Sequence, residues 1–225
     1  MQCVILAAGE GKRMRPLTDE CPKPLVSLLG RPLLDHITDA LPSAITELII
    51  VVGYRADQIR AHCGSEYRGR RVTYVEQNKP KGTANALFLA RPRIKGRFLI
   101  LFADDVHGAD DLAAALKHDL SVLAHEHEHP ERFGVISLHE NGLLKDIVEK
   151  PEKPETNLVS TGVMVLDERI FNYRTEAAPN GEYYIPPLLK ALAADAPVAV
   201  VRQRLWLPIG YPEDIKKAEL LLGSM

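Results

Sequence analysis

The chain of 225 residues is 46% hydrophobic and 26% charged, an ordinary globular composition that excludes wholesale disorder. Its 28 lysines and arginines stand against 30 aspartates and glutamates, so the formal net charge of −2 gives no positive field of the kind that nucleic-acid-binding proteins carry. No apolar run approaches the length needed to span a membrane, and three scattered cysteines favour reduced thiols, so we expect a cytoplasmic enzyme or binding domain.

In the first half, short apolar runs alternate with amphipathic stretches. The runs predict strands, buried on both faces, at residues 4–7, 48–52, 72–75 and 98–102. Helices are expected at 32–41, at 83–87 with Thr83 as the N-cap, and at 110–117, where Asp110 and Asp111 fall in the first turn. This alternation predicts a three-layer α/β fold with a mainly parallel sheet.

The second half has a different pattern, with more strands. We expect them at 122–124, 133–137, 144–149 and 159–166, with a hairpin turn at Asn141-Gly142. A helix at 182–194, a strand at 198–201 and a closing helix from Pro212 follow. Because no Gly/Ser-rich linker separates the halves, we expect one continuous structure.

A glycine loop follows the first predicted strand. Gly9 and Gly11 would let the backbone turn sharply and bring its N–H groups close to an anion, and Arg13 and Lys23 would add positive charge. The loop lacks the Gly-Lys-Ser/Thr ending of a Walker motif, and Met14 excludes Gly-x-Gly-x-x-Gly. A tight turn with surface cations is the alternative interpretation of this loop alone.

The combination of motifs is more specific. Leu6-Ala7-Ala8-Gly9-Glu10-Gly11-Lys12-Arg13-Met14, followed by Pro22-Lys23-Pro24-Leu25, closely resembles the signature of the sugar-1-phosphate nucleotidyltransferases. Six further motifs follow in that family's order: Gln77 before Gly82-Thr83-Ala84, Phe102-Ala103-Asp104-Asp105, Glu149-Lys150-Pro151, Thr161-Gly162-Val163, Gly181-Glu182-Tyr183-Tyr184, and Trp206 to Asp214.

The resemblance, strongest to the short glucose-1-phosphate thymidylyl- and uridylyltransferases, implies a Rossmann-like nucleotidyltransferase fold with a mixed, mainly parallel central sheet. It implies a single domain over 1–225, with a nucleotide-binding half (1–120) and a sugar-binding half (121–225), and no C-terminal β-helix. The reaction would join UTP or dTTP to a hexose 1-phosphate, releasing pyrophosphate, with Mg²⁺ as cofactor. Its partners would be these two substrates, with no nucleic acid or membrane; a homo-oligomer is compatible with the sequence.

The resemblance also implies roles for individual residues. Arg13 would sit on the leaving phosphates, Lys23 would stabilise the α-phosphate and the attacking phosphate, and Asp104, at a strand end, would hold Mg²⁺. The nucleotide-binding set is Leu6, Ala8, Gly9, Gly11, Gln77, Gly82 and Thr83. Gln77 would read the uracil or thymine edge, the alternative being that it only caps its strand.

The sugar-phosphate side draws on both halves of the chain. The set implied there is Asp105, Gly134, Glu149, Lys150, Thr161 and Gly162. Glu149 would accept hydrogen bonds from sugar hydroxyls while Lys150 pairs with the phosphate. Without the resemblance, an ordinary surface Glu–Lys pair would be the preferred interpretation.

The sequence departs from the family at Pro208, where many relatives carry the second metal-binding aspartate. Either Asp104, phosphates and water hold Mg²⁺ alone, or Asp105 or Asp214 substitutes, although Asp214 fits a helix start better. Trp206 is expected in the core or crevice wall. The alternating residues His125, His127 and His129 could bind zinc, but a solvated strand end is favoured.

Two other functions remain open from the sequence. One is a CTP-using nucleotidyltransferase acting on a phosphorylated polyol or choline, which Gln77 argues against. The other is a non-catalytic nucleotide-sugar-binding subunit, supported only by Pro208, since Arg13, Lys23 and Asp104 are all retained.

Overall fold

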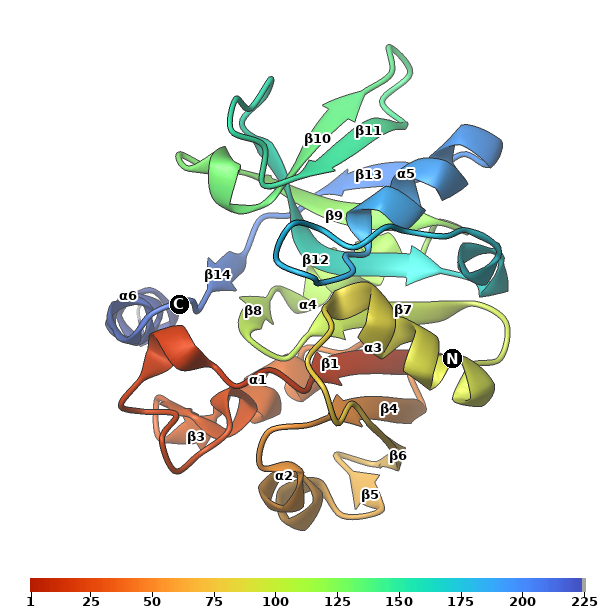
Figure 1. Ribbon diagram of the computed structural model, residues 1–225. Coiled ribbons are helices and arrows are strands. Elements are labelled where there is room, and N and C mark those ends of the chain that lie inside the picture. The colour runs from red at the N-terminus through yellow and green to blue at the C-terminus, as the bar shows by residue number, and fades with distance from the viewer. Residues whose placement is uncertain (224–225) are drawn as a thin grey trace.

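The computed structural model, which describes residues 1–223, is built on one large mixed sheet (Figure 1). Its strands are β1 (Gln2–Ala7), β4 (Glu47–Val52), β5 (Glu66–Tyr67), β6 (Arg70–Glu76), β7 (Phe98–Phe102), β9 (Ser121–Glu126), β10 (Gly134–Leu138), β11 (Leu144–Glu149), β12 (Leu158–Leu166) and β13 (Ala199–Arg202). Eight of them follow the order β11-β10-β12-β7-β1-β4-β6-β5, while β9 pairs with both β12 and β13. Two small ladders lie beside it, β2 (Ser27–Leu28) with β3 (Arg31–Pro32) and β8 (Asp105–His107) with β14 (Trp206–Pro208).

The centre of the sheet is parallel, with β1 between β4 and β7 and with β6 beyond β4. The register pairs Ala7 with Val52, Val52 with Glu76 and Leu6 with Phe102, so the carboxyl ends of all four strands reach the same edge. The chain turns from one side of β1 to the other between β6 and β7. An α/β sheet offers its binding crevice at such a switch point.

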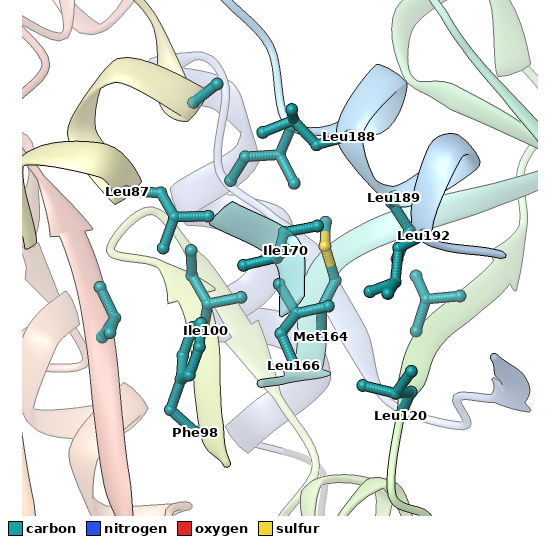
Figure 2. Packing of buried hydrophobic residues seen from close by; sticks show 14 of the residues in the cluster. Leu87, Phe98, Ile100, Leu120, Met164, Leu166, Ile170, Leu188, Leu189 and Leu192 are labelled. Atoms are coloured by element: carbon teal, nitrogen blue, oxygen red, sulfur yellow. The ribbon is translucent and has the colours of Figure 1, made fainter. Parts of the chain in front are cut away.

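Helices cover both faces of the sheet, which gives the predicted three layers. They are α1 (Leu33–Asp39), α2 (Ala56–Cys63), α3 (Thr83–Ala90), α4 (Ala109–Ala115) and α5 (Pro186–Asp195), whereas α6 (Pro212–Gly223) packs on β2 and β14 beside the large sheet. On one face α3 packs over β1 and β4 and α5 over β11, and their apolar side chains share one cluster with those of β7 and β12. Figure 2 shows Leu87 and Leu188 pointing toward Ile100 and Met164. On the other face α1, α2 and α4 pack on the same sheet through a second apolar cluster.

The expected strands are all present, but one is less buried than predicted. β1, β4 and β7 are apolar and almost wholly buried, as their continuous hydrophobic runs indicate. In β6 only Val72 is buried. The reason is its position, because only the two-residue strand β5 lies beyond it.

The second half adds antiparallel strands around β12. This strand pairs antiparallel with β7, β9 and β10, and its register with β9 shifts between Ser160 and Met164. Gly162 lies in that bulge with φ of 81°, and an added Cβ would come 2.6 Å from the Phe102 ring. A glycine is therefore required there, because a side chain would be strained and would collide.

The helix expected at 182–194 begins only at Pro186, because residues 182–184 are irregular and Tyr183 forms hydrogen bonds with Lys81 and Ala84 at the start of α3 instead. Thr83 is not an N-cap: Gly82 holds that position, and the Thr83 hydroxyl accepts a hydrogen bond from the Ile185 N–H. Asp110 and Asp111 do lie in the first turn of α4, as predicted.

The three cysteines are free thiols, and Cys3 and Cys63 are buried. Within residues 1–223, no helix has the length and apolar character that crossing a membrane would require.

Candidate functional site

The glycine loop leaves β1 at the carboxyl edge of the sheet. An added Cβ at Gly9 would meet nothing within 4 Å, so open space lies in front of this backbone. Gly11 has φ of 61°, and its carbonyl accepts a 2.8 Å hydrogen bond from the Thr18 hydroxyl. Its added Cβ would stand 3.2 Å from Cβ of Lys23, so the loop and this lysine are in contact.

Side chains from the β4–α2 connection hold this loop in place. The Tyr54 hydroxyl lies 3.0 Å from the carbonyls of Thr18 and Asp19, and the Arg55 guanidinium donates to Asp19 at 2.6 Å. At Gly53, an added Cβ would lie 2.7 Å from the Ala8 carbonyl oxygen. Gly53 and Tyr54 were not predicted from the sequence, although a glycine directly after a buried parallel strand is a usable signal for close backbone approach.

Lys23 and Asp104 meet at the mouth of the loop. The Lys23 ammonium lies 2.8 Å from Asp104 Oδ2, and Lys23 is only 8% exposed. Burying an ammonium is costly unless it is paired, so the site is built around this ion pair. The other oxygen, Asp104 Oδ1, is buried and no described residue donates to it. Such an orphaned carboxylate oxygen is suited to a hard cation, which takes oxygen ligands.

Asp105 is turned away from Asp104. Its Oδ2 accepts a 2.9 Å hydrogen bond from the Trp206 indole, and its Oδ1 lies 3.4 Å from the Ile209 N–H. Burial and then the adjacent Asp104 carboxylate raise the pKa of Asp105. Both of its oxygens therefore accept hydrogen bonds within the protein.

Pro208 occupies the position at which many relatives carry the second metal-binding aspartate. Pro208 pairs with Asp105 across the β8–β14 ladder. Asp214 does not replace the lost ligand, because its Oδ2 accepts from the N–H groups of Gly210 and Tyr211 at the start of α6. The helix-start interpretation of Asp214 is thus confirmed. Among the residues that the structure describes, no three His, Cys, Asp or Glu side chains gather into a metal site.

Arg13 extends from the glycine loop toward the start of α6. It is exposed, and its guanidinium carbon lies 5.2 Å from the centre of the Tyr211 ring. A cation stacked on an aromatic face stays exposed to solvent and keeps its charge. Arg13 is therefore available to an anionic ligand at the loop.

Gln77 follows β6 on the same edge and is buried. Its Nε2 donates to the Gly82 carbonyl at 3.1 Å and to Asn85 Oδ1 at 3.0 Å. A carbonyl oxygen only accepts, so the Gly82 contact fixes the amide with Nε2 toward the protein. The Gln77 Oε1 is then the atom that remains to accept a hydrogen bond from a ligand.

Glu149 and Lys150 end β11, opposite Gly134 on β10. The Lys150 ammonium lies 3.3 Å from Glu149 Oε1, and the Glu149 side chain is largely buried while that of Lys150 is 54% exposed. Burial raises the pKa of Glu149, although Lys150 acts to lower it. Lys150 has a left-handed backbone with φ of 45°, an uncommon conformation for a residue with a side chain.

The structure places Thr161 within the sheet, and it does not bring the three histidines together as a zinc site, the less favoured of their two sequence-based interpretations. Thr161 is buried and its hydroxyl donates to the Leu123 carbonyl at 3.3 Å, so the side chain supports β9. The three histidines do not converge: His125 contacts the Gln203 carbonyl at 2.9 Å, and the rings of His127 and His129 are 6.2 Å apart.

Trp206 lies between the edge of the sheet that carries Lys23 and Asp104 and the strands β10 and β11. It is buried against Val135 and Val159, as expected of a core residue, and its ring lies 5.1 Å from that of Phe133, next to Gly134. Its indole also binds Asp105, the neighbour of Asp104. The edge that carries Lys23 and Asp104 is thus joined to the β10–β11 strands through one aromatic contact.

Comparison with known proteins agrees with the resemblance seen in the motifs. The Haloferax volcanii protein UTP–glucose-1-phosphate uridylyltransferase AglF is 36% identical to the chain, over 97% of this chain and 95% of that protein. The bifunctional protein GlmU of Methanocaldococcus jannaschii is 30% identical over 99% of the chain, which spans 54% of that relative.

Solved structures share the whole fold. A Bacillus anthracis protein, solved with sucrose and assigned as a glucose-1-phosphate thymidylyltransferase, superposes with a TM-score of 0.89 at 26% identity. The superposition covers 100% of this chain and 96% of the Bacillus anthracis chain. The family model described as nucleotidyl transferase matches residues 2–224. With that match and the relatives above, the protein belongs to the nucleotidyl transferase family.

Proposed function

We propose that the protein transfers a nucleotidyl group from UTP or dTTP to a hexose 1-phosphate, forming a nucleotide sugar and pyrophosphate. The observation that carries this proposal is the buried Lys23–Asp104 pair, with its unpartnered Oδ1, at the mouth of an open glycine loop. The names of the uridylyltransferase from Haloferax volcanii and of the structure from Bacillus anthracis support the same substrate class. We place the reaction in the cytoplasm, in agreement with three free thiols.

The reaction brings two polyanions together, so charge neutralisation and positioning are its main requirements. A phosphate oxygen of the sugar attacks the α-phosphorus in line, and pyrophosphate leaves without a covalent enzyme intermediate. The backbone N–H groups at Gly9 and Gly11 bind phosphate oxygens. Arg13 neutralises the departing pyrophosphate, since its guanidinium is exposed beside the loop.

Lys23 stabilises the charge that builds up at the reacting phosphates. An ammonium has three donors, and one of them points at Asp104. The other two remain for phosphate oxygens, and the cation is already desolvated before substrate binds. A preorganised charge of this kind stabilises a transition state without reorganisation during the reaction.

The divalent ion proposed for this chemistry, Mg²⁺, would neutralise phosphate charge when bound. Asp104 is the residue that fits it, through Oδ1, while Asp105 and Asp214 are occupied by hydrogen bonds within the protein. Since the described residues supply no cluster of three ligands, nucleotide phosphates and water must complete the coordination.

Glu149, Lys150 and Gly134 are proposed to bind the sugar phosphate, with Glu149 accepting from hydroxyls and Lys150 facing the phosphate. Gly162 supports this side through its close packing on Phe102. We further propose that the chain acts as one domain, with residues 1–120 binding the nucleotide and 121–225 the sugar.

The base preference follows from Gln77. Uracil and thymine carry an N3–H donor, which the free Oε1 can accept, whereas cytosine has an acceptor at N3. Gln77→Ala should lower the ratio of kcat/KM for UTP to kcat/KM for CTP by about ten- to a hundredfold. The reason is that a buried polar group without a hydrogen-bond partner costs about 1–3 kcal/mol of free energy. Steady-state kinetics with both nucleotides measures this ratio.

Gln2→Ala is the matched control, because Gln2 is also buried and hydrogen-bonded but lies at the opposite end of β1. It should leave the ratio unchanged. If Gln77→Ala kept the wild-type ratio, base recognition by Gln77 would be ruled out.

A substrate grid tests the function as a whole. Four nucleoside triphosphates are combined with several hexose 1-phosphates, a phosphorylated polyol and phosphocholine, and pyrophosphate release is measured. UTP or dTTP with a hexose 1-phosphate should give the highest turnover. Turnover only with CTP would favour the polyol or choline reaction, and nucleotide binding without any pyrophosphate would favour a binding subunit.

A further inference from the structure

The segment 178–185 lies between the two halves of the site. It forms a tight turn in which the Gly181 N–H donates to the Ala178 carbonyl at 2.7 Å and the Ala178 N–H to the Glu182 carbonyl at 2.8 Å. None of the proposed substrate contacts belongs to this segment. The segment nevertheless contacts residues on the nucleotide side and on the sugar side of the proposed site.

On the nucleotide side, Tyr183 anchors the segment through its backbone. Its N–H donates to the Lys81 carbonyl at 2.9 Å, and its carbonyl accepts from the Ala84 N–H at 2.9 Å. Gly82 allows this approach, because an added Cβ would lie 2.4 Å from the Tyr183 carbonyl oxygen. The segment is therefore fixed to the start of α3.

On the sugar side, the ring of Tyr184 faces Lys150. The Lys150 ammonium lies 5.4 Å from the ring centre, within the range of a cation–π contact. The Tyr184 hydroxyl donates to Glu182 Oε2 at 2.6 Å and accepts from the Asn180 amide at 2.7 Å. These two bonds hold the hydroxyl end of the side chain beside Asn180 and Glu182.

The Lys150 main chain is fixed as well, since its N–H donates to the Phe133 carbonyl at 2.9 Å. Its side chain is more than half exposed and has four rotatable bonds, so the backbone alone does not define where the ammonium lies. Glu149 Oε1 and the Tyr184 ring are its two described contacts. Glu149 is proposed to turn to the sugar hydroxyls, which leaves the ring as the fixed support.

We propose that Tyr184 is a positioning residue, which holds Lys150 in the orientation that binds the sugar phosphate. This inference rests on the proposed function, since it assigns Lys150 to that phosphate. Tyr184 does not touch substrate. Burial and the Glu182 carboxylate raise the pKa of Tyr184, so the ring remains a neutral phenol that attracts a cation on its face.

The test compares Tyr184→Leu, which removes the ring, with Tyr184→Phe, which keeps it and removes only the hydroxyl bonds. Tyr74 on β6 provides the matched control, because the Arg60 guanidinium lies 4.6 Å from its ring centre, and its hydroxyl also donates a hydrogen bond, to the Gly64 carbonyl. Tyr74→Leu and Tyr74→Phe are measured in parallel. For each variant, KM is determined for the sugar 1-phosphate and for the nucleotide, and kcat is determined with both saturating.

Tyr184→Leu should raise KM for the sugar 1-phosphate about five- to tenfold, in the range of a partly desolvated cation–π contact. KM for the nucleotide and kcat should stay within about twofold of wild type, and Tyr184→Phe should recover most of the lost sugar-phosphate affinity. The Tyr74 variants should not change either KM. A purely structural role for Tyr184 would lower kcat or raise both KM values together.

Equal effects on the two KM values, or an unchanged sugar-phosphate KM in Tyr184→Leu, would overturn the positioning role. So would a Tyr184→Phe variant as impaired as Tyr184→Leu. Failure of the proposed function itself is distinguishable, because it would appear in the wild-type protein as no pyrophosphate release with any hexose 1-phosphate.

Discussion

Lys23→Ala is expected to lower kcat by about 10²- to 10³-fold while the protein remains folded. The lysine is buried against Asp104 at 2.8 Å, and its two remaining donors are proposed to bind the reacting phosphates. Without it, the charge that develops at the α-phosphate has no preorganised cation. Turnover at saturating nucleotide and sugar 1-phosphate measures the loss.

Lys190→Ala is a matched control for this variant. Lys190 also pairs with an aspartate, Asp146, at 2.8 Å, but the pair lies on α5 and β11 and is exposed. The kcat of Lys190→Ala should equal that of wild type. Circular dichroism and thermal unfolding are used to check that both variants fold. Wild-type turnover in Lys23→Ala would show that this cation does not act on the reacting phosphates.

Asp104→Asn is expected to remove most activity, again about 10²- to 10³-fold. The substitution keeps the size of the side chain but removes the charge that pairs with Lys23 and the carboxylate oxygen left free for a divalent ion. Asp110→Asn, on the exposed first turn of α4, is the control and should leave activity unchanged.

The same site predicts weak binding of Mg²⁺ to the protein without nucleotide. Because the hydrogen bonds of Asp105 and Asp214 keep them from acting as ligands, calorimetric titration with Mg²⁺ alone should show Kd values no tighter than about 10⁻⁴–10⁻³ M. Affinity should rise when the nucleotide is present, since its phosphates supply oxygen ligands. Tight binding by the free protein, or full activity in a chelator, would contradict the assignment of Asp104.

The nucleotide side of the site was largely predictable from the sequence. Lys23 is presented by flanking prolines, Asp104 follows an apolar strand, and Gln77 ends another, so each lies where parallel strands open their common edge. Local pattern and the direction of the strands were sufficient for this prediction. They could not show that Lys23 and Asp104 pair with each other, because 81 residues separate them in the chain.

The sugar side was less predictable, because it depends on contacts between distant segments. The spacing of apolar residues predicts a helix from residue 182, but that segment is held at the start of α3 instead. The Tyr183 N–H donates to the Lys81 carbonyl and the Tyr183 carbonyl accepts from the Ala84 N–H, so the helix begins only at Pro186. Tertiary hydrogen bonds of this kind override a local helical preference. The roles of Gly53 and Tyr54 in holding the glycine loop have the same origin.

By itself, then, the sequence determined the α/β architecture, the family and the residue types that a polyphosphate site needs, because periodicity and motif spacing are local properties. Only the tertiary structure decided which carboxylates remain free. Asp104 keeps an unpartnered oxygen, while Asp105 binds the Trp206 indole and Asp214 the backbone at the start of α6. All three are acidic residues near strand or helix ends, and what separates them is which N–H groups folding places beside each one.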